Sequence, residues 1–140
     1  MKNCAVRLIA FTLLVILAVS ALAACSSEIQ RKEIAIELLA DDSNGKYYYE
    51  KTEYEALANI KTEFQHRIGK QFEGNISSFM IFADNKTDKF CSIIIFENES
   101  DAKLLESSSC AAFKNDYIVR KGNVVYVGNE NIINYVIDNT

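Results

Sequence analysis

The stretch Phe90–Phe96 constrains the fold more than any other part of the chain. It is almost wholly apolar and rich in β-branched side chains, which is typical of a β-strand. Side-chain alternation divides it into two apolar faces, with Cys91, Ile93 and Ile95 on one and Phe90, Ile94 and Phe96 on the other. A strand that is apolar on both faces usually lies in the centre of a sheet with both sides covered.

Two hairpins are predicted around this strand. Ser77–Ala83 is a second apolar stretch, and the polar loop 84–88 between the two stretches has hairpin length, so they should pair antiparallel. Further along, Lys121-Gly122-Asn123 is a turn signal that joins Tyr117–Val119 to Val124–Val127.

The clearest helix is predicted to begin at Thr52, with Glu55 completing a capping box. Gly74-Asn75 is expected to end it. Apolar side chains recur along it at spacings of three and four, which gives one buried stripe: Tyr54, Leu57, Ile60, Phe64, Ile68 and Phe72.

Two more helices are expected in the second half of the chain. Ser100 should cap the first and Asn129 the second. Their expected inner faces are Ala102, Leu105, Ser109, Ala112 and Phe113 in the first and Ile132, Ile133, Val136 and Ile137 in the second.

These elements predict an α+β domain. Starting from the tyrosine run Tyr47–Tyr49, the order β-α-β-β-α-β is ferredoxin-like, with an antiparallel sheet, helices on one face, and an extra C-terminal strand and short helix. Alternatively, the tyrosine run belongs to a helix, and two N-terminal helices precede ββαββα. Ile34–Leu39 fits either a strand or a helix.

The first 24 residues have the pattern of a secretory signal peptide. Lys2 and Arg7 are the only charges before position 28, and they precede an apolar run from Leu8 to Ala24 that is interrupted only by Thr12 and Ser20. A signal anchor and ordinary cleavage after Ala24 both remain open for such a segment.

The end of this leader, Leu22-Ala23-Ala24-Cys25, resembles the lipobox of bacterial lipoproteins. The resemblance implies cleavage between Ala24 and Cys25, a diacylglyceryl group on the Cys25 thiol, and often an acylated amino terminus. Two acyl chains together hold a protein stably on a membrane, whereas a single acyl chain binds only marginally. We therefore expect a signal peptide (1–24), a lipidated tether (25–33) and one domain (34–140) on the extracytoplasmic face of the cell membrane.

The charge of the chain beyond the leader argues against nucleic acid as a partner. Two of the 15 basic residues lie in the leader, which leaves 13 against 19 acidic residues and a formal charge of −6. An acidic surface repels phosphate backbones. Ser92–Ala102 resembles the third strand and following helix of an RNA-recognition motif, but the basic and paired aromatic pattern of its RNA-binding strand is missing.

Cys91 and Cys110 are the cysteines that remain beside Cys25 after cleavage. An even number in an extracytoplasmic domain permits a disulfide. The alternative is two buried thiols, which we favour because Cys110 lies off the buried stripe of its helix.

No catalytic, cofactor or metal site is expected. His66 is the only histidine, and neither a nucleophile nor a set of ligands is spaced around it. Asp41–Gly45 resembles the start of a calcium loop, but Thr52 stands where the loop needs an acidic residue.

Four tyrosines form the most suggestive surface: Tyr47, Tyr48, Tyr49 and Tyr54. Tyrosines stack on sugar rings or anchor protein interfaces, although alternate ones could equally lie in the core. We expect a membrane-tethered, non-enzymatic binding module for a protein, peptide or glycan. The alternative is an accessory subunit of an envelope transporter or cell-wall complex, docked through Phe90, Ile94, Phe96 and Phe79 or Phe82 unless the terminal helix covers that face.

Overall fold

The computed structural model of the chain describes residues 28–69, 71–109 and 116–140. Within these residues a helix (28–41) leads into strand β1 (Tyr47–Lys51). A short 3₁₀ helix η1 (Tyr54–Ala56), helix α2 (Leu57–Ile68), and strands β2 (Ile76–Asp84) and β3 (Phe90–Phe96) follow. The chain then forms α3 (Glu99–Ser109), β4 (Tyr117–Lys121), β5 (Val124–Gly128) and α4 (Glu130–Asn139).

The strands form one five-stranded sheet in the order β1-β2-β3-β5-β4, and every neighbouring pair is antiparallel. β3 therefore lies at the centre, as its two apolar faces predict. Both predicted hairpins are present, β2–β3 and β4–β5, and Gly122 takes the left-handed conformation in the second turn, with φ of 58°.

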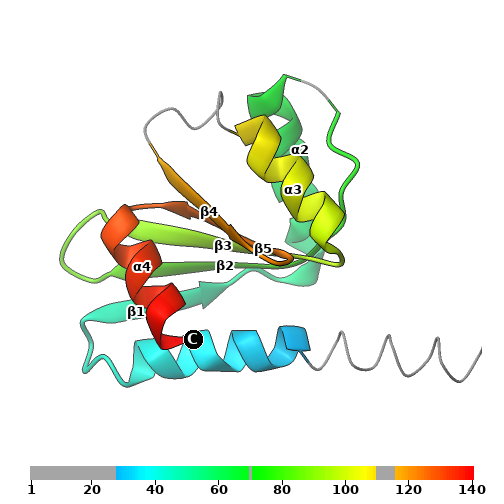
Figure 1. Cartoon of the computed structure of the whole chain (residues 1–140). Coiled ribbons are helices and arrows are strands. Elements are labelled where there is room, and N and C mark those ends of the chain that lie inside the picture. The colour runs from blue at the N-terminus through cyan, green and yellow to red at the C-terminus, as the bar shows by residue number, and fades with distance from the viewer. Residues whose placement is uncertain (1–27, 70, 110–115) are drawn as a thin grey trace, which may run out of the picture.

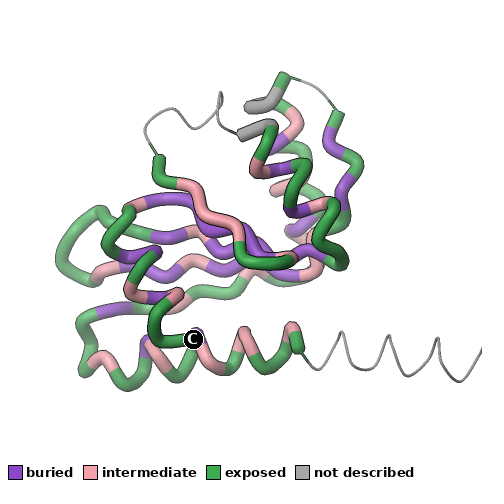
Figure 2. The backbone as a smooth tube through the Cα atoms, in the orientation of Figure 1, coloured by how far each residue is buried: buried purple, intermediate pink, exposed green. Residues whose placement is uncertain are grey.

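Helices cover both faces of the sheet (Figure 1). α2 and α3 lie on one face, where Phe64 of α2 and Leu105 of α3 pack against Ile94 and Phe96 of β3. The N-terminal helix and α4 lie on the other face. Figure 2 shows that the central strands β3 and β5 are mostly buried, whereas the edge strands β1 and β4 and the helices are partly exposed.

The predicted α+β class is confirmed, and so are the antiparallel sheet, the two central helices on one face, and the additional C-terminal strand and helix. Tyr47–Tyr49 is a strand, so the helical alternative for this run is wrong. The pairing differs from split βαβ units in one respect. β1 and β2 flank α2 but pair directly with each other and run antiparallel.

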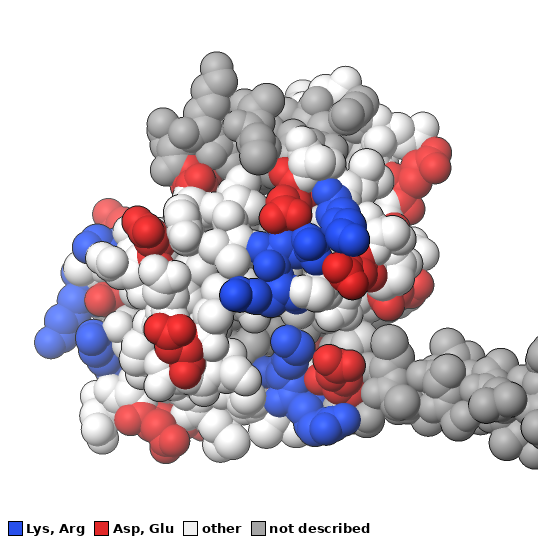
Figure 3. Space-filling view, in the orientation of Figure 1, with Lys and Arg blue, Asp and Glu red and all other residues white. Residues whose placement is uncertain are grey.

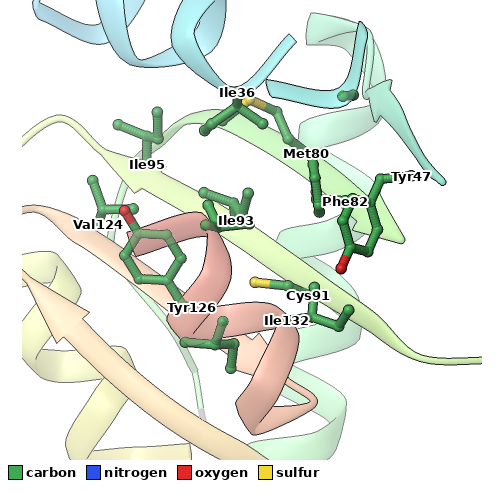
Figure 4. Packing of buried hydrophobic residues seen from close by; sticks show 13 residues of the cluster. Ile36, Tyr47, Met80, Phe82, Cys91, Ile93, Ile95, Val124, Tyr126 and Ile132 are labelled. Carbon is green, nitrogen blue, oxygen red and sulfur yellow. The ribbon is translucent and has the colours of Figure 1, made fainter. Parts of the chain in front are cut away.

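The core beneath the N-terminal helix and α4 forms the larger of the two apolar clusters (Figure 4). Ile36 of the helix and Ile133 of α4 meet Met80, Cys91 and Ile93 of the sheet there. Ile34–Leu39 is therefore helical. Residues 28–33, which the sequence assigns to a tether, continue the same helix, and Ile29 packs against this cluster.

Helix α2 is shorter than predicted. Thr52 does not cap it; the backbone N–H of Thr52 donates to the carbonyl of Phe79, and the 3₁₀ turn precedes the helix. Gly69, in the left-handed conformation with φ of 73°, ends it. Phe72 nevertheless reaches the core, from the segment after the helix, and its ring lies 5.9 Å from that of Phe96.

The cap of α3 also differs from the prediction. The side-chain oxygen of Asn98, not that of Ser100, accepts the backbone N–H of Asp101 at 3.0 Å. Ala102 and Leu105 are buried as predicted, whereas Ala112 and Phe113 lie outside the described residues. In α4 the expected residues Ile132, Ile133 and Val136 are buried, and Asn129 precedes the helix.

In the described part of the chain, no helix is both long and apolar enough to cross a membrane.

Candidate functional site

The four tyrosines do not form one surface. Tyr47 is buried, with ring centroids 5.0 Å from Phe82 and 4.9 Å from Tyr135 of α4. Tyr49 packs partly buried against the same core, where burial, followed by the nearby carboxylates of Glu33 and Glu37, raises its pKa. Alternation along β1 thus turns these two side chains into the core.

Tyr48 and Tyr54 remain exposed, but they lie in different places. Tyr48 is 44% exposed at a shallow hollow with Ile81 and Phe90, near the β2–β3 turn. Tyr54 is 81% exposed on η1, at a hollow formed with Lys61 and Glu97. The structure therefore does not bring the predicted tyrosine contact surface together.

The apolar sheet face predicted as a docking surface is largely covered, by α2 and α3 and not by the terminal helix. Ile94 and Phe96 are 1% and 0% exposed beneath these helices, whereas Phe82 lies on the opposite face. Phe90, at the start of β3, is the member of the set that stays open, with 44% exposure.

A cavity of about 310 Å³ lies where α2 leaves this sheet face partly uncovered. Its walls come from the consecutive elements α2, β2 and β3 and from β5, which follows much later in the sequence. Its apolar lining consists of Ile60, Phe64, Phe79, Phe90, Ile94 and Val127. The volume and the apolar walls are those of a small-molecule pocket.

The polar groups of the cavity are few. Asn59 and Glu63 contribute from α2, Ser92 from β3, and Asp116 from the residue before β4. Asn59, Glu63 and Asp116 are exposed, whereas Ser92 is half-buried. The cavity therefore has an apolar interior with one hydroxyl and a more polar rim that carries two carboxylates.

One residue of the cavity, Ser92, stands out in the sequence, although the sequence pattern alone does not predict a cavity there. Ser92 is the one polar residue in β3, and it lies on the face that also carries Ile94. In the structure, Ser92 lines the cavity. The helix residues around it could not be identified without the tertiary arrangement.

Two of the remaining predicted positions, His66 and Cys91, lie among the described residues. His66 is exposed on α2. Among the described residues, no group of three or more histidine, cysteine, aspartate or glutamate side chains is placed to hold a metal ion. Cys91 is a buried free thiol whose pKa is raised to about 12, chiefly by burial. Cys110 lies outside the described residues, as do Ala24 and Cys25.

Acidic and basic side chains are interspersed on the molecular face in Figure 3. No protein-family model, curated protein or solved structure matches this chain.

Proposed function

We propose that this protein is a lipid-anchored binding module on the extracytoplasmic face of a bacterial cell membrane. The apolar cavity between α2 and the sheet carries the binding part of the proposal, because it offers a small molecule both a water-poor interior and a polar rim. The module binds and releases its ligand without converting it.

The anchoring part rests on the lipobox-like sequence that ends at Cys25. The described N-terminal helix begins three residues after this cysteine and packs on the sheet through Ile36 and Ala40. A domain whose first described residue lies three positions from the lipidated cysteine would stay close to the bilayer, within reach of ligands at its surface.

Intact mass spectrometry of the membrane fraction tests the anchor. The wild-type protein should have the mass of residues 25–140 plus a diacylglyceryl group, with or without a further acyl chain. Cys25→Ser should lose this species, whereas Cys4→Ser, a matched change within the leader, should retain it. A full-length or unmodified wild-type protein would exclude the lipid anchor.

The second candidate is an accessory subunit of an envelope transporter or cell-wall complex. Its expected sheet face is covered, but the N-terminal helix exposes Ile34 and Leu38, each 54%. If this helix face is the contact, Ile34→Asn with Leu38→Asn should shift the protein from a large species to monomer on native gels. An unchanged native species would argue against it.

A further inference from the structure

We propose that the cavity between α2 and the sheet binds a small organic cation, an ammonium group on a compact apolar body. The inference rests on the proposed binding function and specifies its ligand class. It follows from the apolar walls, the two carboxylates at the rim, and a lining in which the described residues include no basic side chain.

The apolar walls determine the body of the ligand. Phe79, Ile94 and Val127 form the sheet side, and Ile60 and Phe64 form the helix side. Ile94 and Val127 are 1% and 5% exposed, so the sheet wall is part of the packed core. An aromatic ring or short alkyl group placed between these walls would bury apolar surface on both sides.

The rim determines the charge of the ligand. Glu63 reaches the cavity from α2 and Asp116 from the start of β4, so carboxylates approach it from two separate elements. Both are exposed, and no ion pair involves either of them among the described residues. A cation at the rim would therefore meet carboxylates from two elements.

The neighbouring surface strengthens this preference. An adjoining hollow shares Phe90 and Asp116 with the cavity, and it adds Asp88 and Glu130 against Lys89. Among the described residues, four carboxylates and one ammonium group thus border the two hollows. Their combined field attracts cations and repels carboxylates or phosphates at the rim.

Ser92 supplies a further oxygen on the half-buried sheet wall. A hydroxyl oxygen accepts a hydrogen bond from an ammonium group as readily as it donates one to other ligands. Because this hydroxyl can serve either ligand, the rim carboxylates determine the order: the cavity would bind an amine more tightly than an alcohol of the same shape, and an acid of that shape least tightly.

Three probes that share a phenylethyl body test this order: 2-phenylethylamine, 2-phenylethanol and 3-phenylpropanoate. They would be titrated into purified wild-type protein and followed by amide chemical shifts in NMR spectra. We expect all responsive amides to cluster around Ser92, Ile94 and Val127. The amine should bind at least tenfold more tightly than the alcohol, and the acid should bind more weakly than the alcohol.

Two sets of variants separate the charge from the cavity. Glu63→Gln with Asp116→Asn should abolish the preference for the amine while alcohol binding persists. Asp138→Asn, an exposed carboxylate on α4 at the opposite sheet face, should leave the preference unchanged. Ser92→Phe should fill the cavity and abolish binding of every probe, with a folded amide spectrum as the check.

The outcomes distinguish the ligand class from the binding function itself. Equal binding of the three probes in the cavity, or an amine preference that survives the loss of both carboxylates, would overturn the cationic ligand and leave the binding module. Failure of all three probes to perturb the cavity amides would overturn both.

Discussion

Arg120 of β4 donates from its Nε to a carboxylate oxygen of Glu106 on α3, over 2.8 Å. Its Nη1 also donates to Glu99, at the start of α3, and to the carbonyl of Gly122, both at 2.9 Å. One guanidinium thus joins both ends of α3 to the edge strand and its turn. Through this contact the helix is held on the sheet face that contains the cavity.

The first prediction concerns the pH dependence of this contact. Hydrogen bonding to Arg120, followed by attraction to Lys103, lowers the pKa of Glu99 below its ordinary value of 4.5. A carboxylate with a lowered folded-state pKa stabilises the fold above its unfolded-state pKa and loses that effect as pH falls through the folded-state pKa. We therefore expect Glu99→Gln to lower the midpoint of urea unfolding at pH 7 and to change it little near pH 2.

Exposed ion pairs weaken as salt screens them, so the deficit of Glu99→Gln at pH 7 should also shrink in 1 M NaCl. Glu53→Gln, an exposed carboxylate before η1, provides the control and should show neither dependence. A Glu99→Gln deficit of equal size at both pH values would contradict the role of the ionised carboxylate.

The second prediction tests the docking of the N-terminal helix. Ile36 is 2% exposed within the core and Ile34, two residues earlier on the same helix, is 54% exposed. Ile36→Ala should lower the free energy of unfolding by about 2–5 kcal/mol, since it removes buried methyl groups and leaves a cavity. Ile34→Ala should change it by about 0.5 kcal/mol or less. Equal effects in chemical denaturation would show that this helix does not belong to the folded domain.

The third prediction concerns Gly128 at the end of β5. Its φ is 142°, and a Cβ atom there would lie 2.3 Å from the backbone carbonyl oxygen of Phe90. The backbone conformation alone costs a residue with a side chain about 1–3 kcal/mol, and the clash adds to it because backbone cannot rotate away. Gly128→Ala should therefore lower the thermal unfolding midpoint strongly or prevent folding.

Gly122→Ala is the matched control, because this glycine also has a positive φ, 58°, but a Cβ atom would meet nothing within 4 Å. It should cost only the backbone term of about 1–2 kcal/mol. Equal stability of the two variants would contradict the close approach of the β3 and β5 backbones at Gly128.

The fourth prediction concerns the Cys91 thiol. Burial raises its pKa to about 12, so the thiolate that reacts with alkylating reagents is scarce at pH 8. Iodoacetamide should leave Cys91 unmodified in the native protein and label it fully in denaturant without reductant, as read by peptide mass mapping. Labelling that requires prior reduction would instead show a disulfide at Cys91.

Core residues could be predicted from the sequence where the pattern of apolar residues within a single element was sufficient. The alternation along Phe90–Phe96 predicted a central strand covered on both sides, and the residues expected on each face lie there. Ile34–Leu39, by contrast, fitted either a strand or a helix, and its local pattern did not decide between them. Ile34–Leu39 is helical because Ile36 and Ala40 pack on the sheet, a contact absent from the local sequence.

The site was predicted less accurately than the fold, because the tyrosine surface was inferred from composition alone. Strand alternation placed Tyr47 in the core and Tyr48 on the other face, whereas Tyr54 lies apart on η1. The covering of the predicted docking face by α2 and α3 was likewise not visible in the sequence, because nothing in a helix's apolar stripe specifies which sheet face it meets.

The sequence by itself determined the central strand, the hairpins and the α+β class, because side-chain periodicity and turn residues act over a few neighbours. It also carries the lipobox-like stretch Leu22–Cys25, a pattern of four adjacent residues on which the proposed anchor rests. Only the tertiary structure decided which helix covers which face and where the cavity lies. Those outcomes depend on how the helices and the sheet assemble: Glu63 on α2, Ser92 on β3 and Asp116 before β4 line one cavity only in the folded chain.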